Sequence, residues 1–326
     1  MSQRRYRILL LVCVFVCIYS LCLACQPARR PLANQPELLS TELEQICGGY
    51  DQARMLGHIR ELTSPAYEGR AVGTEGERQV AAYLTSQLAL WQLKPWTELG
   101  LTDFRHSFSV QKTKIRGQNV IAVRRGTTDQ WILLVAHYDH LGVKHSTLYP
   151  GADDNAAGVA ILLETARCVA LAPQAPQHNV AFVLTSGEER NLSGSKALAA
   201  LLRRQGLAQR CRVVNMDMMG GTGGNSLDVW REPSRPSGRQ LVRQVRQIIT
   251  DAGLKSNVVR RRFGAVDSRS FARAGMPSVT LSWAYQVRYH PHRHQTTDTF
   301  DELRPELLRK AAQGILRIVW LLANTS

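Results

Sequence analysis

Two adjacent glutamates, Glu188 and Glu189, follow an apolar stretch at residues 179–185 that has the composition of a buried strand. Two carboxylates this close repel each other, and the pKa of one of them rises unless a cation lies beside them. A metal ion removes that conflict, because one carboxylate binds the ion while the other stays free to act as a base. The pair therefore predicts metal-dependent chemistry at the end of a strand.

Further groups of the metal-ligand type lie at the ends of other apolar stretches or at the start of a helix. They are His137 with Asp139, the pair Asp153 and Asp154, Asp217, and a segment that contains His290, His292 and His294. Each group alone is more often a helix cap or an ordinary polar residue than a metal site. Taken in order, two histidines and three carboxylates form a nitrogen and oxygen ligand set that suits zinc, cobalt or manganese. The set predicts a metallohydrolase.

The elements that carry these groups alternate along the chain. Apolar or β-branched stretches predict strands at residues 119–123, 131–136, 179–185, 212–216 and 278–282. Helical spacing predicts helices at 51–62, 75–93, 154–171, 194–204, 235–252 and 303–322. This alternation predicts an α/β fold, a three-layer sandwich in which helices flank a largely parallel central sheet. Ligands bind beyond the carboxyl ends of such strands, where several of the candidate ligands are expected.

The composition is that of a globular protein, with 44% hydrophobic and 21% charged residues among 326. The net charge of +15 makes nucleic acid a candidate partner. We find neither a strand-borne aromatic platform nor a basic helix motif, so we expect no nucleic-acid partner and interpret the charge as a solvated or membrane-facing surface. The cysteines have no ligand-like spacing, which argues against a thiolate metal site.

The first 25 residues predict export. Three arginines precede an uncharged, mostly apolar stretch at residues 8–25, the pattern of a signal peptide. Its end, Ala24-Cys25, resembles a bacterial lipoprotein signal in which Cys25 is lipidated; an uncleaved membrane anchor and a cleaved signal are the alternatives. Residues 26–43 are then expected to form a tether and residues 44–326 the catalytic domain. We expect that domain in the cell envelope, attached to the membrane and facing the periplasm or the exterior.

Together the motifs resemble those of the M28 family of zinc metallopeptidases, the bacterial aminopeptidases, over residues 48–323. The resemblance is strongest in Ala136-His-Tyr-Asp-His-Leu-Gly142 and Gly151-Ala-Asp-Asp-Asn-Ala-Ala-Gly158. It continues in Gly187-Glu-Glu and in Asn215-Met-Asp-Met-Met-Gly220. It implies a phosphorylase/hydrolase-like fold, two Zn²⁺ ions per chain, and removal of N-terminal residues from peptides that have a free N-terminus.

The resemblance also implies a set of metal ligands. His137 and Asp217 would bind one ion, Glu189 and His294 would bind the other, and Asp154 would bridge the two. The family motif places the histidine ligand four residues before an Asp-Thr pair, which selects His294. His290 and His292 are then extra residues that would supply a contact at the rim of the site or an adventitious metal site.

The remaining roles concern proton transfer and orientation. Glu188 would be the general base that takes a proton from water, and Asp139 would orient His137. The chain departs from the family pattern at Asn191, where a glycine is usual, and at Asp267-Ser268, where Asp-His is usual. The second departure implies a different side chain near the substrate.

Two other functions remain open. A glutaminyl-cyclase-like acyltransferase shares the fold and would hold one zinc ion with Asp154, Glu189 and His294, so the ligand residues do not separate it from a peptidase. The shorter spacing between Glu188-Glu189 and Gly194-Ser195 favours the peptidase. A non-catalytic binding module on the same fold is the other alternative, and the complete ligand set argues against it.

Overall fold

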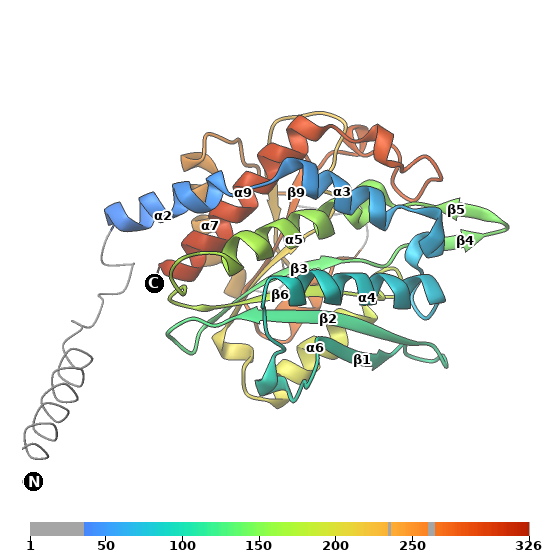
Figure 1. Cartoon of the computed structure of the whole chain (residues 1–326), viewed down its shortest axis with the longest axis horizontal. Coiled ribbons are helices and arrows are strands. Elements are labelled where there is room, and N and C mark those ends of the chain that lie inside the picture. The colour runs from blue at the N-terminus through green and yellow to red at the C-terminus, as the bar shows by residue number, and fades with distance from the viewer. Residues whose placement is uncertain (1–35, 234–235, 260–264, 326) are drawn as a thin grey trace, which may run out of the picture.

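The computed structural model describes residues 36–233, 236–259 and 265–325 (Figure 1). The signal predicted over residues 1–25, with Cys25, lies outside the described residues. Within the described ranges, none of the helices combines the length and the apolar character needed to cross a membrane.

The described residues form a central seven-stranded sheet in the order β1-β2-β6-β3-β7-β9-β8. Its four inner strands run parallel: β6 (Asn179–Thr185), β3 (Trp131–His137), β7 (Cys211–Met216) and β9 (Ser278–Trp283). The outer strands pair antiparallel: β1 (Arg105–Ser109), β2 (Arg116–Arg124) and β8 (Leu227–Trp230). A separate hairpin consists of β4 (Gly142–Lys144) and β5 (Thr147–Tyr149). The predicted parallel sheet is thus confirmed in its centre, and its edges are antiparallel.

The inner strands are apolar because both of their faces are covered. Every residue of β3 and β6 is buried, which is typical of parallel strands between two helix layers. Along β3, Ile132 and Leu134 belong to one hydrophobic core, and Leu133 and Val135 belong to the other. The alternation follows from the two-residue period of a strand.

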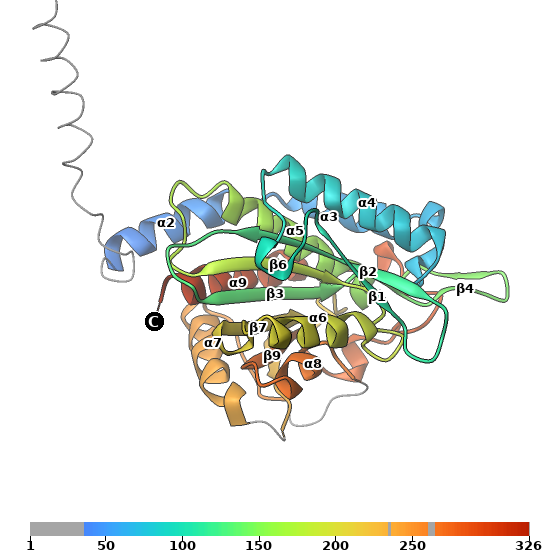
Figure 2. The ribbon, with the colours of Figure 1, turned by 90° about the horizontal axis from the view of Figure 1, so that it is seen from below.

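Helices cover both faces of the sheet, as Figures 1 and 2 show. The first core joins one face to α2 (Pro36–Gly48), α3 (Gln52–Leu62), α4 (Glu75–Leu90), α5 (Ala157–Ala170), α7 (Arg239–Asp251) and α9 (Pro305–Asn324). The second core joins the other face to α6 (Ser193–Arg204) and α8 (Ser268–Arg273). The three-layer α/β sandwich is therefore confirmed.

Two local differences from the predicted elements concern the tether and the site. The tether expected over residues 26–43 is helical from Pro36 onward, because Leu43 and Ile46 pack into the first core. Helix α5 begins at Ala157 and not at residue 154, because Asp154 and Asn155 have non-helical φ and ψ angles. Asp154 therefore lies in an irregular turn before the helix.

Candidate metal centre

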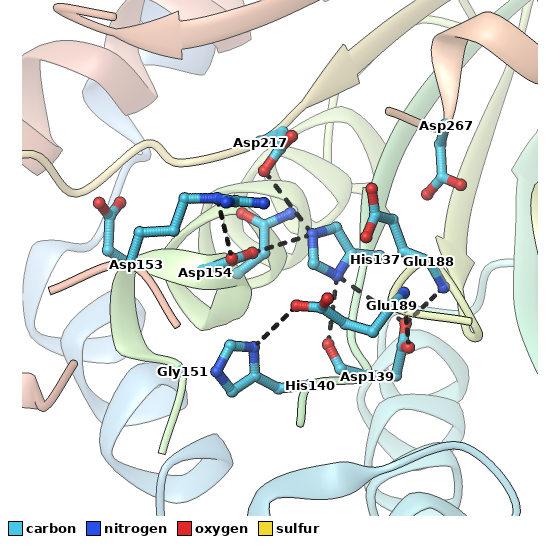
Figure 3. A network of polar contacts seen from close by, with 12 residues as sticks. His137, Asp139, His140, Gly151, Asp153, Asp154, Glu188, Glu189, Asp217 and Asp267 are labelled. Atoms are coloured by element: carbon cyan, nitrogen blue, oxygen red, sulfur yellow. Dashed lines mark hydrogen bonds and ion pairs between the residues drawn. The ribbon is translucent and has the colours of Figure 1, made fainter. Parts of the chain in front are cut away.

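The predicted site residues meet at the carboxyl ends of the parallel strands. His137 is the last residue of β3, Glu188 and Glu189 follow β6, and Asp217 directly follows β7. Asp154 comes from the turn before α5, and His294 comes from the segment between β9 and α9. Figure 3 shows the side chains of His137, Asp154, Glu189 and Asp217 converging from these separate segments.

Asp154 lies at the centre of the group. Its Oδ1 is 3.3 Å from Nε2 of His137, and its Oδ2 is 3.2 Å from Nε2 of His294. The turn that places it requires a glycine at position 151, where φ is +61° and a Cβ atom would lie 2.5 Å from both the main-chain oxygen of Asp154 and Cγ of His140. Asp154 thus presents one oxygen to each histidine, the arrangement that a bridging carboxylate needs.

Each histidine also faces a second carboxylate. Nε2 of His137 is 3.7 Å from Oδ1 of Asp217, and Nε2 of His294 is 3.0 Å from Oε1 of Glu189. Two groups of ligand atoms, each within 4.8 Å of one another, can be drawn from His137, Glu188 and Asp217 and from His140, Asp154 and Glu189. These two groups contain four of the five predicted ligands, with Glu188, the predicted base, in the first group and His140 in place of His294 in the second.

The donor set fits zinc. Two ligand atoms bound to one zinc ion in tetrahedral geometry lie roughly 3.3–3.6 Å apart, close to the separations of 3.0–3.7 Å between the imidazole nitrogens and carboxylate oxygens here. Oε1 of Glu189 and Nε2 of His294 are buried without a well-aligned hydrogen bond, although they lie near each other. Buried polar atoms seldom lack a partner, so these atoms are suited to a metal ion.

His140 is a candidate ligand that the sequence interpretation did not assign. Its Nδ1 is 3.3 Å from Oε1 of Glu189, the residue is 1% exposed, and neither ring nitrogen has a well-aligned hydrogen bond within the described residues. His140 belongs to the same short motif as His137 and Asp139. Its position after the strand was a usable signal, but only the fold shows that its ring faces Glu189.

Asp139 acts through main-chain contacts. Its carboxylate oxygens accept hydrogen bonds from the N–H groups of Glu188 at 3.1 Å and Glu189 at 3.3 Å. Nδ1 of His137 lies nearer to the main-chain oxygen of Asp139, at 3.2 Å, than to its carboxylate, at 3.8 Å. The expected orientation of His137 therefore comes first from the main chain of Asp139, while its carboxylate holds the turn that carries the glutamate pair.

The two glutamates have opposite electrostatic environments. Burial raises the pKa of Glu188 well above its usual range, and the negative charges of Asp217 and Asp267 add to that effect. Burial also acts to raise the pKa of Glu189, but contacts with His140 and His294 outweigh it and lower the pKa to about 2. Glu189 thus remains a carboxylate that can bind a cation, whereas Glu188 has the proton affinity that a general base needs.

The extra histidines lie outside the metal groups. His290 is buried; one ring nitrogen contacts the carboxylate of Asp153 and the other lies 2.8 Å from the main-chain oxygen of Trp283. His292 is on the surface, where it approaches Glu302 at 3.3 Å and Thr297 at 2.8 Å. Among the described contacts His290 is therefore a buried structural partner of Asp153, and neither histidine faces the predicted ligands.

Asp298 supports the same turn from the opposite side. Its two carboxylate oxygens accept hydrogen bonds from the main-chain N–H groups of Asp153 at 2.8 Å and Asp154 at 3.1 Å. Asp298 is the aspartate of the Asp-Thr pair that follows His294 by four residues. His294, a predicted ligand, is therefore only four residues from Asp298, which holds the turn that carries Asp154.

The chain matches the sequence profile of Peptidase family M28 over residues 119–319. The protein belongs to peptidase family M28. The matched range contains the seven predicted site residues, whose roles stay predictions, and the membership confirms the prediction of a metallopeptidase.

Several curated relatives of this M28 peptidase have named activities. The alkaline phosphatase isozyme conversion protein of Escherichia coli is 22% identical over 78% of this chain and 84% of its own length. Leucine aminopeptidase 1 of Arthroderma otae is 27% identical over 69% of this chain, and the probable lipoprotein aminopeptidase LpqL of Mycobacterium tuberculosis is 25% identical over 78% of it. The chain spans only 61% and 55% of those two relatives.

Solved structures share the fold of this M28 peptidase. LapA aminopeptidase of Legionella pneumophila has a TM-score of 0.73 at 20% identity, covering 90% of this chain and 75% of its own. BSAP, a zinc aminopeptidase from Bacillus subtilis, has a TM-score of 0.70 at 16% identity, covering 85% and 96%. The glutaminyl cyclase of Porphyromonas gingivalis has a TM-score of 0.67 at 18% identity, covering 82% and 97%. The fold therefore accommodates both of the enzyme classes that the sequence left open.

Proposed function

We propose that this M28 peptidase is a zinc-dependent aminopeptidase that removes residues from the free N-terminus of peptides. The observation that carries the proposal is the position of Asp154, with one carboxylate oxygen near His137 and the other near His294. The aminopeptidase names of several relatives support the direction of cleavage.

Two zinc ions would be held by the residues that the sequence predicted. His137 and Asp217 would bind one ion, Glu189 and His294 the other, and Asp154 both; His140 is an additional donor beside Glu189. Zinc bound here would polarise the scissile carbonyl and stabilise the negative charge that develops on its oxygen. Cobalt or manganese would suit the same nitrogen and oxygen donors.

The protein's own groups would perform the proton transfer. Glu188 lies within 4.8 Å of the ligand atoms of His137 and Asp217, so it can accept a proton from the attacking water and pass it to the leaving amine. Its raised pKa makes it a stronger base than an exposed glutamate. Asp139 would be a positioning residue, because it holds the main chain of Glu188 in place.

The test of this function uses the purified full-length chain and a panel of aminoacyl-p-nitroanilides that includes the leucyl substrate. We expect hydrolysis that stops after chelation and returns when zinc is added. Conversion of N-terminal glutaminyl peptides to the cyclised product, with no hydrolysis of the panel, would instead establish the glutaminyl-cyclase alternative. That alternative shares the fold of this chain and also predicts a single zinc ion.

We also propose that the protein is exported and attached to the membrane through Cys25. The uncharged stretch that ends at Ala24-Cys25 supports this, as does the lipoprotein name of one relative. Metabolic labelling with a fatty acid should label the wild type and not a Cys25→Ser variant. Equal labelling of both would overturn the lipid attachment, and recovery in the cytoplasmic fraction would overturn export.

A further inference from the structure

Arg293 places a permanent positive charge beside the metal centre. It directly precedes His294, and its Nε is 3.7 Å from Oδ2 of Asp154. Its side chain is 35% exposed, so the guanidinium is accessible to a ligand. The preceding residue, His292, faces Glu302 and Thr297 on the surface. Arg293 is therefore a partly exposed residue at the edge of the site.

The contacts of Arg293 are not those of a structural brace. A guanidinium that only supports a carboxylate usually forms two short parallel hydrogen bonds with it. Here the shortest distance to Asp154 is 3.7 Å, and Arg293 forms no side-chain hydrogen bond within the part of the chain that the structure describes. The guanidinium N–H groups of Arg293 are therefore available to donate hydrogen bonds to a bound ligand.

The surrounding charges indicate the sign of that partner. The carboxylate that Arg293 approaches is that of Asp154, one of the predicted metal ligands. Metal ions bound by Asp154 would take up the negative charge of that carboxylate. The guanidinium of Arg293 would then have no ion-pair partner among the described contacts, and a positive charge at a partly exposed position attracts an anion. A planar guanidinium is matched in shape to a carboxylate.

We propose that Arg293 binds a carboxylate of the substrate close to the scissile bond and is a specificity-determining residue of this enzyme. The inference rests on the proposed aminopeptidase function. The carboxylate has two sources, the acidic side chain of the N-terminal residue and the C-terminal carboxylate of a dipeptide. Both present the same planar anion to the guanidinium, and neutral analogues of the same shape exist for both.

The experiment uses two pairs of peptides that differ only in that charge. Glu-Gly-amide and Gln-Gly-amide test the side chain, and Leu-Gly and Leu-Gly-amide test the C-terminus. The kcat/KM of the zinc-loaded full-length enzyme should favour the charged member of one pair by about 10- to 100-fold, the range expected for a hydrogen bond to a charged group. The pair that shows this preference identifies the source of the carboxylate.

Substitution of Arg293 assigns the preference to one residue. Arg293→Gln should reduce the ratio to near one, and Arg293→Lys should retain part of it. Arg288→Gln is the matched control, because Arg288 is exposed and lies over the ring of Tyr289. Zinc analysis of each variant separates loss of recognition from loss of metal.

Binding supplies a readout that does not require turnover. In a Glu188→Ala background, calorimetric dissociation constants for the four peptides should show the same preference with Arg293 present and lose it in the Arg293→Gln double variant. If the wild type hydrolyses none of the peptides, the proposed function fails while the binding ratios still test this inference. Equal affinities within both pairs, or a ratio that Arg293→Gln leaves unchanged, would overturn the role of Arg293.

Discussion

The carboxylate of Asp139 accepts a hydrogen bond from the main-chain N–H of Glu188 at 3.1 Å. Its other oxygen accepts one from Glu189 at 3.3 Å, so one side chain fixes both members of the glutamate pair. The two adjacent carboxylates lie in different environments. The pKa of Glu188 is raised, and that of Glu189 is lowered to about 2. Adjacent residues therefore acquire different chemistry through burial and through the histidines beside Glu189.

Replacement of Glu188 separates metal binding from proton transfer. Glu188→Ala should retain the metal content of the wild type, because the predicted ligands remain. It should lower kcat by about 100- to 10,000-fold, the usual contribution of a general base. Inductively coupled plasma analysis and the nitroanilide assay measure the two effects. Hydrolysis at the wild-type rate would show that another group accepts the proton.

Replacement of His140 tests the ligand that the fold added. His140 lies 3.3 Å from Glu189 and is 1% exposed, so His140→Ala should weaken the affinity for one of the two metal ions by more than the roughly 10- to 100-fold loss typical of residues that only support a metal ligand. His294→Ala should have a larger effect, because His294 approaches both Glu189 and Asp154. Titration with a zinc indicator gives both affinities. An unchanged affinity in His140→Ala would show that His140 does not contribute to metal binding.

Replacement of His290 tests the buried pair with Asp153. The Asp153 carboxylate would lose a buried partner, while the N–H of Gly220 would still donate to its other oxygen at 2.7 Å. His290→Ala should therefore lower the free energy of unfolding by roughly 3 kcal/mol in urea titrations. His292→Ala is the control, because that side chain is on the surface and should change stability by less than about 0.5 kcal/mol. Similar losses in both variants would argue against the buried pair.

A pH dependence of stability is expected from His58, which lies far along the chain from the ligands. Burial lowers its pKa to about 4, with a smaller effect of Arg54, and its Nδ1 lies 2.5 Å from the hydroxyl of Tyr83. Because the unfolded chain takes up this proton near pH 6.5 and the folded chain only near pH 4, the free energy of unfolding should fall as the pH drops between those values. One such histidine accounts for about 3 kcal/mol at most.

The matched variant for this effect is His58→Gln, which keeps a hydrogen-bond acceptor for Tyr83. Wild type and variant are compared by urea unfolding at pH 7 and pH 4.5. The wild type should lose more stability on acidification than the variant. Parallel losses in the two proteins would assign the acid sensitivity to other groups.

The central strands were predictable because each is an uninterrupted apolar stretch of the sequence. The strand ending at His137 and the strand before Glu188 are apolar throughout, so their ends and the residues that follow could be located. The edge strand β1 was missed because most of its residues are not buried and its pattern is weak. Helix α2 was expected to be part of a tether, and its packing through Leu43 and Ile46 depends on α5 and α9, which lie far along the chain.

The site also has one part that was predictable from the sequence and one part that was not. Its main residues could be proposed because each lies in a short motif of the family. The contact between His140 and Glu189 joins residues 49 positions apart, and that between Arg293 and Asp154 joins residues 139 positions apart. Neither contact leaves a local pattern, because only the convergence of the strand ends creates it. The contact between His290 and Asp153 is also long-range and leaves no local pattern in the sequence.

The metal content of the purified full-length protein, measured together with its hydrolytic activity, tests the central claim most directly. The positions of His137, Asp217, Glu189 and His294 around the two oxygens of Asp154 predict two zinc ions per chain. Removing them with a chelator should abolish aminoacyl-p-nitroanilide hydrolysis, and restoring two equivalents of zinc should return it. One zinc ion at saturation, or hydrolysis that persists without metal, would contradict a dinuclear aminopeptidase.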